Sequence, residues 1–324
     1  MTANHGVVLV NLGTPASPTT RDVRCFLREF LSDPRVVNLP RLLWLPILYG
    51  IILPFRSTKV AKLYRQIWWP EGSPLKVITQ RQTTKLAALL STGEPRAQVR
   101  YAMVYGEPSL RMVINDLKKC GAETITVLPL YPQYCSATTG SIVDQLECLQ
   151  KRIGSGISIS MAKEYFDDDL YIAALAESIA SYRQQNNKGE FLLFSFHGIP
   201  QSLIDQGDPY YQQCHITAAQ VALRLQLPSH SWQVAFQSRF GKAEWAKPYT
   251  DLVIQDLAHK GIKNLDVITP AFASDCLETL EEIAVQNAEL FQHSGGEQLT
   301  LIPCLNDNDA HIALMKKIFE KNIS

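Results

Sequence analysis

A histidine at the end of an apolar run is the first residue here that could do chemistry. Residues 191–196 form an apolar and aromatic run, typical of a buried strand in a parallel sheet, and His197-Gly198 follows directly. Ligands of open α/β sheets bind at the carboxyl ends of strands, where His197 could bind a metal or accept a proton near neutral pH. A purely structural histidine is the alternative, so other residues must decide.

Carboxylates open a predicted helix after another strand. Asp275, Glu278 and Glu282 are spaced three and four residues apart, which would place them on one face of an α-helix. Stacked like charges repel one another unless a metal, another cation or protons compensate them. The alternative is that these carboxylates are simply solvated, with those in the first turn stabilised by the dipole at the helix N-terminus.

Basic, hydroxyl and aromatic residues gather in two other segments. Arg56 and Lys59 come at the end of an apolar stretch and Tyr64 follows them, while Ser238 and Trp245 follow a predicted strand. Such side chains could bind the carboxylates of an amphipathic ligand. The alternative for each is a solvated surface.

Alternating strand and helix patterns must position these residues. Strands are expected at 6–11, 98–104, 124–130, 157–162, 191–196, 232–236, 265–269 and 298–303. Helices are expected at 109–119, 141–151, 168–185, 209–225 and 277–291. This alternation predicts an α/β fold with parallel sheets and helices on both faces.

The eight strands divide into two sets of four that resemble each other. Residues 12–15 match 197–200, residues 114–117 match 254–257, and residues 128–131 match 269–272, at offsets of 185, 140 and 141. These matches, in order, predict two Rossmann-like lobes with four-stranded parallel sheets, and a cleft between them. We expect an N-terminal lobe at 1–163 with an insertion at 30–75, and a C-terminal lobe at 164–324 whose last helix, 309–322, could pack back on the first.

The duplication exposes a chemical asymmetry. His197 corresponds to Leu12, and Glu278 to Ala137. One wall of the predicted cleft is therefore polar and acidic, and the other is apolar. Such a slot suits a flat, apolar ligand that needs a metal or a proton acceptor on one face.

Composition narrows the class of protein. The 324 residues include 31 Lys plus Arg and 31 Asp plus Glu. The formal net charge is therefore zero, and no overall positive electrostatic field favours binding to nucleic acid. The seven cysteines include no C-x-x-C pair, which suits reduced thiols in the cytoplasm. The N-terminus leads straight into a predicted strand, so no signal peptide is expected.

One apolar stretch, 39–55, resembles a membrane segment. It is 17 residues long and contains Arg41 and prolines at 40, 46 and 54, which argue against a transmembrane helix. It is either a buried helical insertion or an apolar lip that touches a membrane or an apolar ligand.

Several motifs, taken in order, resemble the ferrochelatase family, most closely its bacterial form. The matching stretches are VVLVNLGTP (7–15), REFLSDPRVV (28–37), YRQIWWPEGSPL (64–75), YGEPS (105–109), LPLYPQYCSATTGS (128–141), FSFHGIP (194–200), FQSRFG (236–241) and FASDCLETLEE (272–282). The resemblance spans nearly the whole chain. It implies insertion of Fe²⁺ into protoporphyrin IX with release of two protons, which forms protohaem in the last step of haem biosynthesis.

By this resemblance, His197 and Glu278 correspond to the active-site pair and are candidate metal ligands, with Asp275 and Glu282 on a metal transfer path. The positions associated with the porphyrin propionates are Arg56, Lys59 and Ser238, and the pocket-wall positions are Leu12, Tyr64, Trp245 and Phe272.

The chain departs from some members of the family. Leu12 stands where they carry Met or Tyr, Val104 replaces an arginine, and Cys276 replaces a histidine. No resident cofactor is implied, because Fe²⁺ is a substrate and the cysteine cluster of an iron–sulfur centre is absent from the sequence. A cobalt chelatase of corrinoid synthesis and a non-catalytic tetrapyrrole- or metal-binding protein are the alternatives. The expected location is the cytoplasm, with peripheral contact at the inner membrane face as an option.

Overall fold

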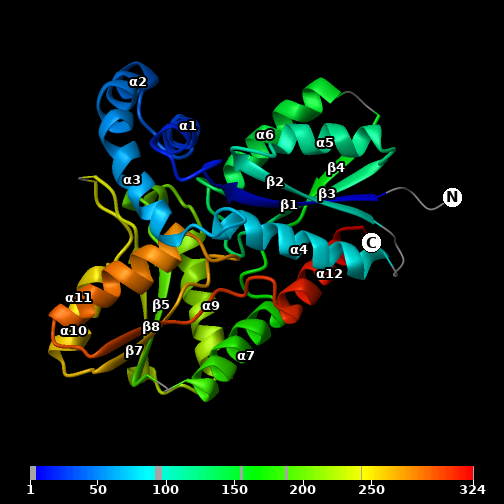
Figure 1. The fold of residues 1–324 in the computed structure, drawn as a ribbon. Helices are drawn as coiled ribbons and strands as arrows, with labels where there is room; N and C mark the ends of the chain where they lie inside the picture. Colours follow the sequence, from blue (N-terminus) through cyan, green and yellow to red (C-terminus); the bar gives the residue numbers. More distant parts are fainter. Residues whose placement is uncertain (1–4, 92–96, 154–155, 187–188, 242, 324) are drawn as a thin grey trace. The chain divides into compact units, whose positions relative to one another are not determined.

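The computed structural model describes residues 5–91, 97–153, 156–186, 189–241 and 243–323 as an α/β protein with two parallel sheets (Figure 1). The strands are β1 (His5–Gly13), β2 (Ala97–Tyr105), β3 (Thr124–Pro129), β4 (Ser158–Met161), β5 (Phe191–His197), β6 (Trp232–Gln237), β7 (Asn264–Ile268) and β8 (Gln298–Leu301). Every strand expected from the sequence is confirmed, with small shifts at the ends.

The two sheets repeat one topology, which confirms the duplication. Their strand orders are β2-β1-β3-β4 and β6-β5-β7-β8, with all neighbours parallel. Gly6 pairs with Ile125 in the first sheet, and Phe191 pairs with Leu265 in the second. The same register therefore relates the sheets at offsets of 185 and 140 residues.

The chain divides into two compact units. Unit 1 comprises Met1–Tyr131, Ser136–Lys163 and Asp307–Ser324, and unit 2 comprises Pro132–Cys135 and Glu164–Asn306. The C-terminal helix thus belongs to unit 1 with the first sheet.

Helices cover both faces of the sheet in unit 1. The helices are α1 (Thr20–Leu31), α2 (Arg41–Ile47), the π-helix η1 (Leu48–Ile52), α3 (Leu53–Ile67), α4 (Pro74–Ser91), α5 (Leu110–Lys119), α6 (Thr139–Ile153) and α12 (Asp309–Ile323). On one face α4 and α12 lie together, and α5 and α6 lie on the other (Figure 1). Helix α5 buries Leu110, Val113, Ile114 and Leu117, an i, i+3, i+4, i+7 pattern that gives it one apolar stripe.

Unit 2 has the same layered plan. Its helices are α7 (Asp169–Gln185), α8 (Gln201–Asp205), α9 (Tyr210–Arg224), the 3₁₀ turn η2 (Ser229–Ser231), α10 (Thr250–His259), the π-helix η3 (Glu278–Asn287) and α11 (Ala288–His293). Helices α7 and α9 pack together, as do α10 and α11 (Figure 1). The core between the sheet and α10 and α11 includes Leu193, Ile254, Leu265 and Phe291.

The apolar stretch 39–55 is exposed over much of its length, although Trp44, Leu48 and Leu53 are buried. Leu42 is 91%, Leu43 66% and Phe55 72% exposed. Trp44 is buried and its indole N–H donates to the Leu31 carbonyl at 2.7 Å, which fastens α2 to the end of α1. Within the described residues, no helix combines the length and apolar character needed to cross a membrane.

Candidate active site

Three polar residues of unit 2 meet where β5 and β6 end. His197 is the last residue of β5 and pairs in register with Gln237, the last residue of β6. Ser238 follows and reaches η3, because its backbone N–H donates to Glu282 Oε1 at 2.8 Å and its hydroxyl donates to Glu282 Oε2 at 2.5 Å. The strand ends that the sequence predicted as a ligand edge therefore lie against the acidic helix.

The surroundings of His197 define its chemistry. Its side chain is half-buried, and Nδ1 lies 2.7 Å from the Gly198 carbonyl oxygen. A carbonyl oxygen can only accept a hydrogen bond, so Nδ1 carries a proton, and in the corresponding tautomer Nε2 has the lone pair. The ring centroid lies 6.3 Å from that of Phe272. Nε2 can therefore bind a metal or accept a proton.

The acidic helix differs from the expected α-helix. A helix is confirmed, but residues Glu278–Asn287 form a π-helix. In a helix closed by i→i+5 hydrogen bonds, side chains four and five apart share a face, so Glu278 aligns with Glu282. Burial raises the pKa of the Glu282 carboxyl above its ordinary value, and Glu278 adds to this rise; the Ser238 hydrogen bonds and nearby His197 act in the opposite direction.

Asp275 does not continue this line of carboxylates. It is buried in the turn before η3, where its carboxylate accepts hydrogen bonds from Asn306 Nδ2 at 2.6 Å and from the Thr279 hydroxyl at 3.0 Å. Its own N–H donates to Asn306 Oδ1 at 2.8 Å. The spacing of three that suggested a shared face applies to an α-helix and not to a π-helix. A part for Asp275 in metal transfer stays a prediction.

Four other candidates lie in unit 1. Leu12 is half-buried near the end of β1, and Arg56, Lys59 and Tyr64 lie on α3. Tyr64 is buried and its ring centroid is 5.9 Å from that of Trp68. Arg56 and Lys59 are three residues apart and therefore neighbours on the helix surface, with Arg56 half-buried and Lys59 exposed.

The remaining wall candidate, Trp245, belongs to unit 2. It lies in the segment after β6, is half-buried, and donates its indole N–H to the Phe240 carbonyl at 2.8 Å. Within the described residues, no group of three or more His, Cys, Asp and Glu side chains is arranged to hold a metal ion.

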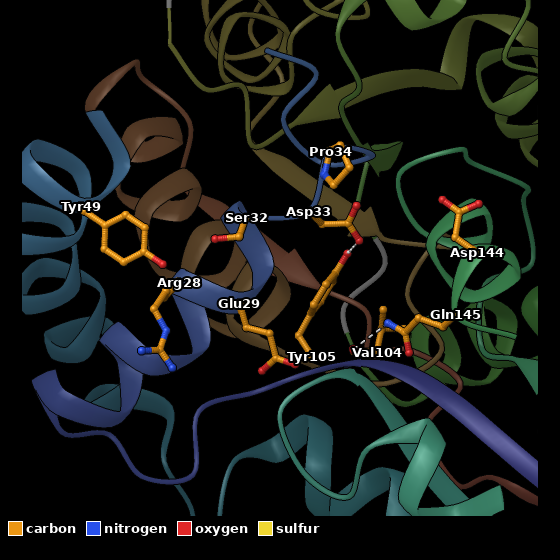
Figure 2. A pocket seen from close by; sticks show the side chains of 10 residues that line it. All are labelled: Arg28, Glu29, Ser32, Asp33, Pro34, Tyr49, Val104, Tyr105, Asp144 and Gln145. Atoms are coloured by element: carbon orange, nitrogen blue, oxygen red, sulfur yellow. Dashed lines mark hydrogen bonds between the residues drawn. The ribbon is translucent and has the colours of Figure 1, made fainter. Parts of the chain in front are cut away.

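Unit 1 has an open cavity of about 570 Å³ (Figure 2). It is lined by Arg28, Glu29, Ser32, Asp33, Pro34, Tyr49, Val104, Tyr105, Asp144 and Gln145. Figure 2 shows the Tyr105 hydroxyl directed at Asp33, to which it donates at 2.7 Å. The carboxylate of Glu29 accepts the Gly106 N–H at 2.9 Å, and burial raises its pKa.

Sequence reasoning missed two kinds of residue. It singled out Val104 but not the acidic residues of this cavity, although Glu29 and Asp33 lie within the REFLSDPRVV motif. It also missed Gln237 and Asn306, which hold the acidic helix and its preceding turn. The FQSRFG motif contains Gln237 and was the available signal for it.

Comparison with known proteins places this chain in one family. The family model described as Ferrochelatase matches residues 4–323. A ferrochelatase of Aeromonas hydrophila is 49% identical over 324 residues, with 100% of both chains covered. Ferrochelatase 1 of Shewanella oneidensis is 50% identical over 317 residues, covering 98% of this chain and 95% of that protein.

Solved structures share the fold at low sequence identity. The sirohydrochlorin chelatase SirB from Bacillus subtilis subspecies spizizenii, in complex with cobalt, aligns with a TM-score of 0.54 at 11% identity and covers 99% of this chain and 94% of its own. CbiX, described as the terminal enzyme of sirohaem biosynthesis in denitrifying bacteria, aligns with a TM-score of 0.53 at 13% identity and covers 99% and 100%.

Proposed function

The chain belongs to the ferrochelatase family and is a metal chelatase, and on this premise we propose that it inserts Fe²⁺ into protoporphyrin IX through His197 and Glu278. The product would be protohaem, and two protons would be released. The observation that carries the assignment of residues is the half-buried imidazole of His197, whose Nδ1 donates to a carbonyl and whose Nε2 keeps its lone pair.

Metallation exchanges two pyrrole N–H protons for one divalent cation. Neutral imidazole and carboxylate can each accept such a proton or bind Fe²⁺, so His197 and Glu278 suit both parts of the exchange. Leu12 has the equivalent place in unit 1 and can do neither, which supports a role as an apolar wall against the macrocycle. An enzyme that binds its substrate bent towards the shape of the transition state can build about 1–5 kcal/mol of strain into the bound substrate.

The porphyrin propionates would be held by Arg56, Lys59 and Ser238. The support is the pair of neighbouring cations on α3, one half-buried and one exposed. The Ser238 hydroxyl already donates its hydrogen to Glu282, so only its oxygen is left to face a propionate, which is an acceptor as well. A bridging water, or a proton on the propionate, would supply the hydrogen between them. Tyr64, Trp245 and Phe272 would pack against the ring.

Peripheral contact with a membrane, at its cytoplasmic face, is part of the same proposal. The support is the exposed apolar surface of α2 and η1, formed by Leu42, Leu43, Ile47 and Ile51, with Phe55 just beyond it. Exposed apolar groups that lie together indicate an interaction surface, and α3 carries the basic residues that follow them.

Porphyrin fluorescence tests the proposed reaction directly. Purified protein at catalytic concentration, mixed anaerobically with protoporphyrin IX and Fe²⁺, should consume many equivalents of fluorescent free porphyrin, and consumption should require the metal. A single equivalent of change would indicate a binding protein. Faster turnover of sirohydrochlorin with Co²⁺ would favour the corrinoid alternative.

A further inference from the structure

A chain of buried polar side chains links Ser195, two residues before His197 on β5, to the backbone carbonyl of Glu278. The Ser195 hydroxyl donates to Gln237 Oε1 at 2.8 Å. On its other side, Gln237 Nε2 donates to the backbone carbonyl of Glu278 at 2.8 Å and faces Glu282 Oε2 at 3.3 Å. The Thr250 hydroxyl lies 2.9 Å from Ser195 Oγ. One amide thus spans the distance from the sheet to the first residue of η3.

The hydrogen-bond partners of the Gln237 amide determine its orientation. The Glu278 carbonyl and the Glu282 carboxylate are acceptors, so the NH₂ group of Gln237 must face them and its oxygen must face Ser195. Because the Ser195 hydrogen is then used, Thr250 donates to Ser195 Oγ. Ser195, Gln237 and Thr250 are 0%, 3% and 1% exposed, so these groups have one another rather than bulk water as hydrogen-bond partners.

The elements joined by this amide are the ones that carry the proposed chemistry. Ser195 precedes His197 by two residues on β5, and Gln237 pairs with His197 across the sheet. The carbonyl held by Gln237 belongs to Glu278 itself. The strand end with the imidazole and the helix start with the carboxylate are therefore fixed to a common buried side chain.

We propose that Gln237 is a positioning residue that sets the place of Glu278 relative to His197, and that Ser195 acts with it by fixing the direction of the amide. This inference rests on the proposed function of His197 and Glu278. Gln237 itself needs no contact with porphyrin or iron. Its effect would come through geometry, and misplacement of a reacting group by about 1 Å can cost on the order of 10²-fold in rate.

A double-mutant cycle tests the inference. Gln237→Met keeps the length of the side chain and removes its N–H donor, and Glu278→Gln keeps the backbone carbonyl but removes the carboxylate proposed to accept a proton or bind Fe²⁺. We expect Gln237→Met to lower kcat by about 10-fold or more, to change porphyrin affinity by less than about 3-fold, and to leave folding intact. In the Glu278→Gln background the same change should cost less than about 3-fold, because its target is already lost. The matched control is Gln233→Met at the other end of β6, for which no loss of kcat is expected.

The possible results distinguish a failure of the positioning role of Gln237 from a failure of the proposed function of Glu278. If Glu278→Gln retains wild-type turnover, the proposed function of Glu278 fails and the inference fails with it. If Glu278→Gln is impaired while Gln237→Met is not, or if the two losses simply multiply, the positioning role of Gln237 is overturned alone. Should Gln237→Met fail to fold, Ser195→Ala takes its place in the same cycle; it keeps Gln237 and should lower kcat by about 3-fold, again only when Glu278 is present.

Discussion

Leu12 and His197 occupy equivalent positions in the two sheets. The register that pairs Gly6 with Ile125 in one sheet pairs Phe191 with Leu265 in the other, and the same offset carries Leu12 onto His197. One copy of the unit thus has a hydrocarbon side chain where the other has an imidazole with a lone pair on Nε2. Of the two residues at this position, only His197 has a side chain that can accept a proton or bind a metal.

Removing either reacting group should abolish most turnover without unfolding the protein. Loss of a general base typically costs about 10²–10⁴-fold in rate, whereas loss of a packing residue costs stability instead. We expect His197→Ala and Glu278→Gln each to lose at least about 10²-fold in kcat and still to bind porphyrin by fluorescence titration. His259→Ala, at the exposed end of α10, is the control. Near wild-type turnover by a folded His197→Ala protein would make this histidine structural.

The half-buried cation of α3 should affect porphyrin binding more than chemistry. Charge-assisted hydrogen bonds to a carboxylate are stronger than neutral ones, so Arg56→Ala should raise KM for protoporphyrin more than it lowers kcat. With a porphyrin diester, which lacks the carboxylates, wild type and variant should behave alike. Lys62→Ala, exposed on the same helix, is the control. An undiminished difference with the diester would show that Arg56 contacts another group.

The exposed apolar surface of α2 and η1 should determine vesicle binding. Changing Leu42, Leu43 and Ile47 to Ser removes apolar area that would enter the lipid interface, so the variant should bind less in flotation with anionic vesicles. Leu223→Ser, on α9, changes an equally exposed leucine (78%) away from that surface and should have no effect. Equal flotation of wild type and triple variant would contradict the membrane contact.

The cavity in unit 1 predicts a pH-dependent effect on stability. Burial raises the pKa of Glu29 in the folded protein, so its charged form destabilises that state once the pH is above this pKa. Glu29→Gln keeps an oxygen that can accept the Gly106 N–H and cannot become charged. We expect it to raise the denaturant midpoint at pH 7.5, with the difference disappearing as the pH falls below 4.5 and both side chains are neutral. Glu289→Gln, at an exposed position of α11, controls for charge alone. A lower midpoint for Glu29→Gln at pH 7.5 would contradict the prediction.

The sheet was predictable from sequence because its strands are apolar runs bounded by turn residues, as at residues 191–196 before His197-Gly198. The repeat of LGTP by HGIP also exposed the duplication. The π-helix was not predictable, because an apolar pattern does not distinguish i→i+5 from i→i+4 hydrogen bonding over ten residues. The pairing of Asp275 with Asn306 joins residues 31 positions apart, and no local pattern specifies such a contact.

The last helix of unit 1 is synthesised after unit 2, so unit 1 cannot be completed before unit 2 has been made. Helix α12, which buries Ile312, Met315 and Phe319, packs on α4 and β3 of unit 1, yet the ribosome produces it only after all of unit 2. The first sheet emerges early and stays partly uncovered until all of unit 2 has been made. Apolar surface left open in this way favours aggregation and calls for chaperones. A premature stop codon near Asp307 would therefore damage unit 1 more than unit 2.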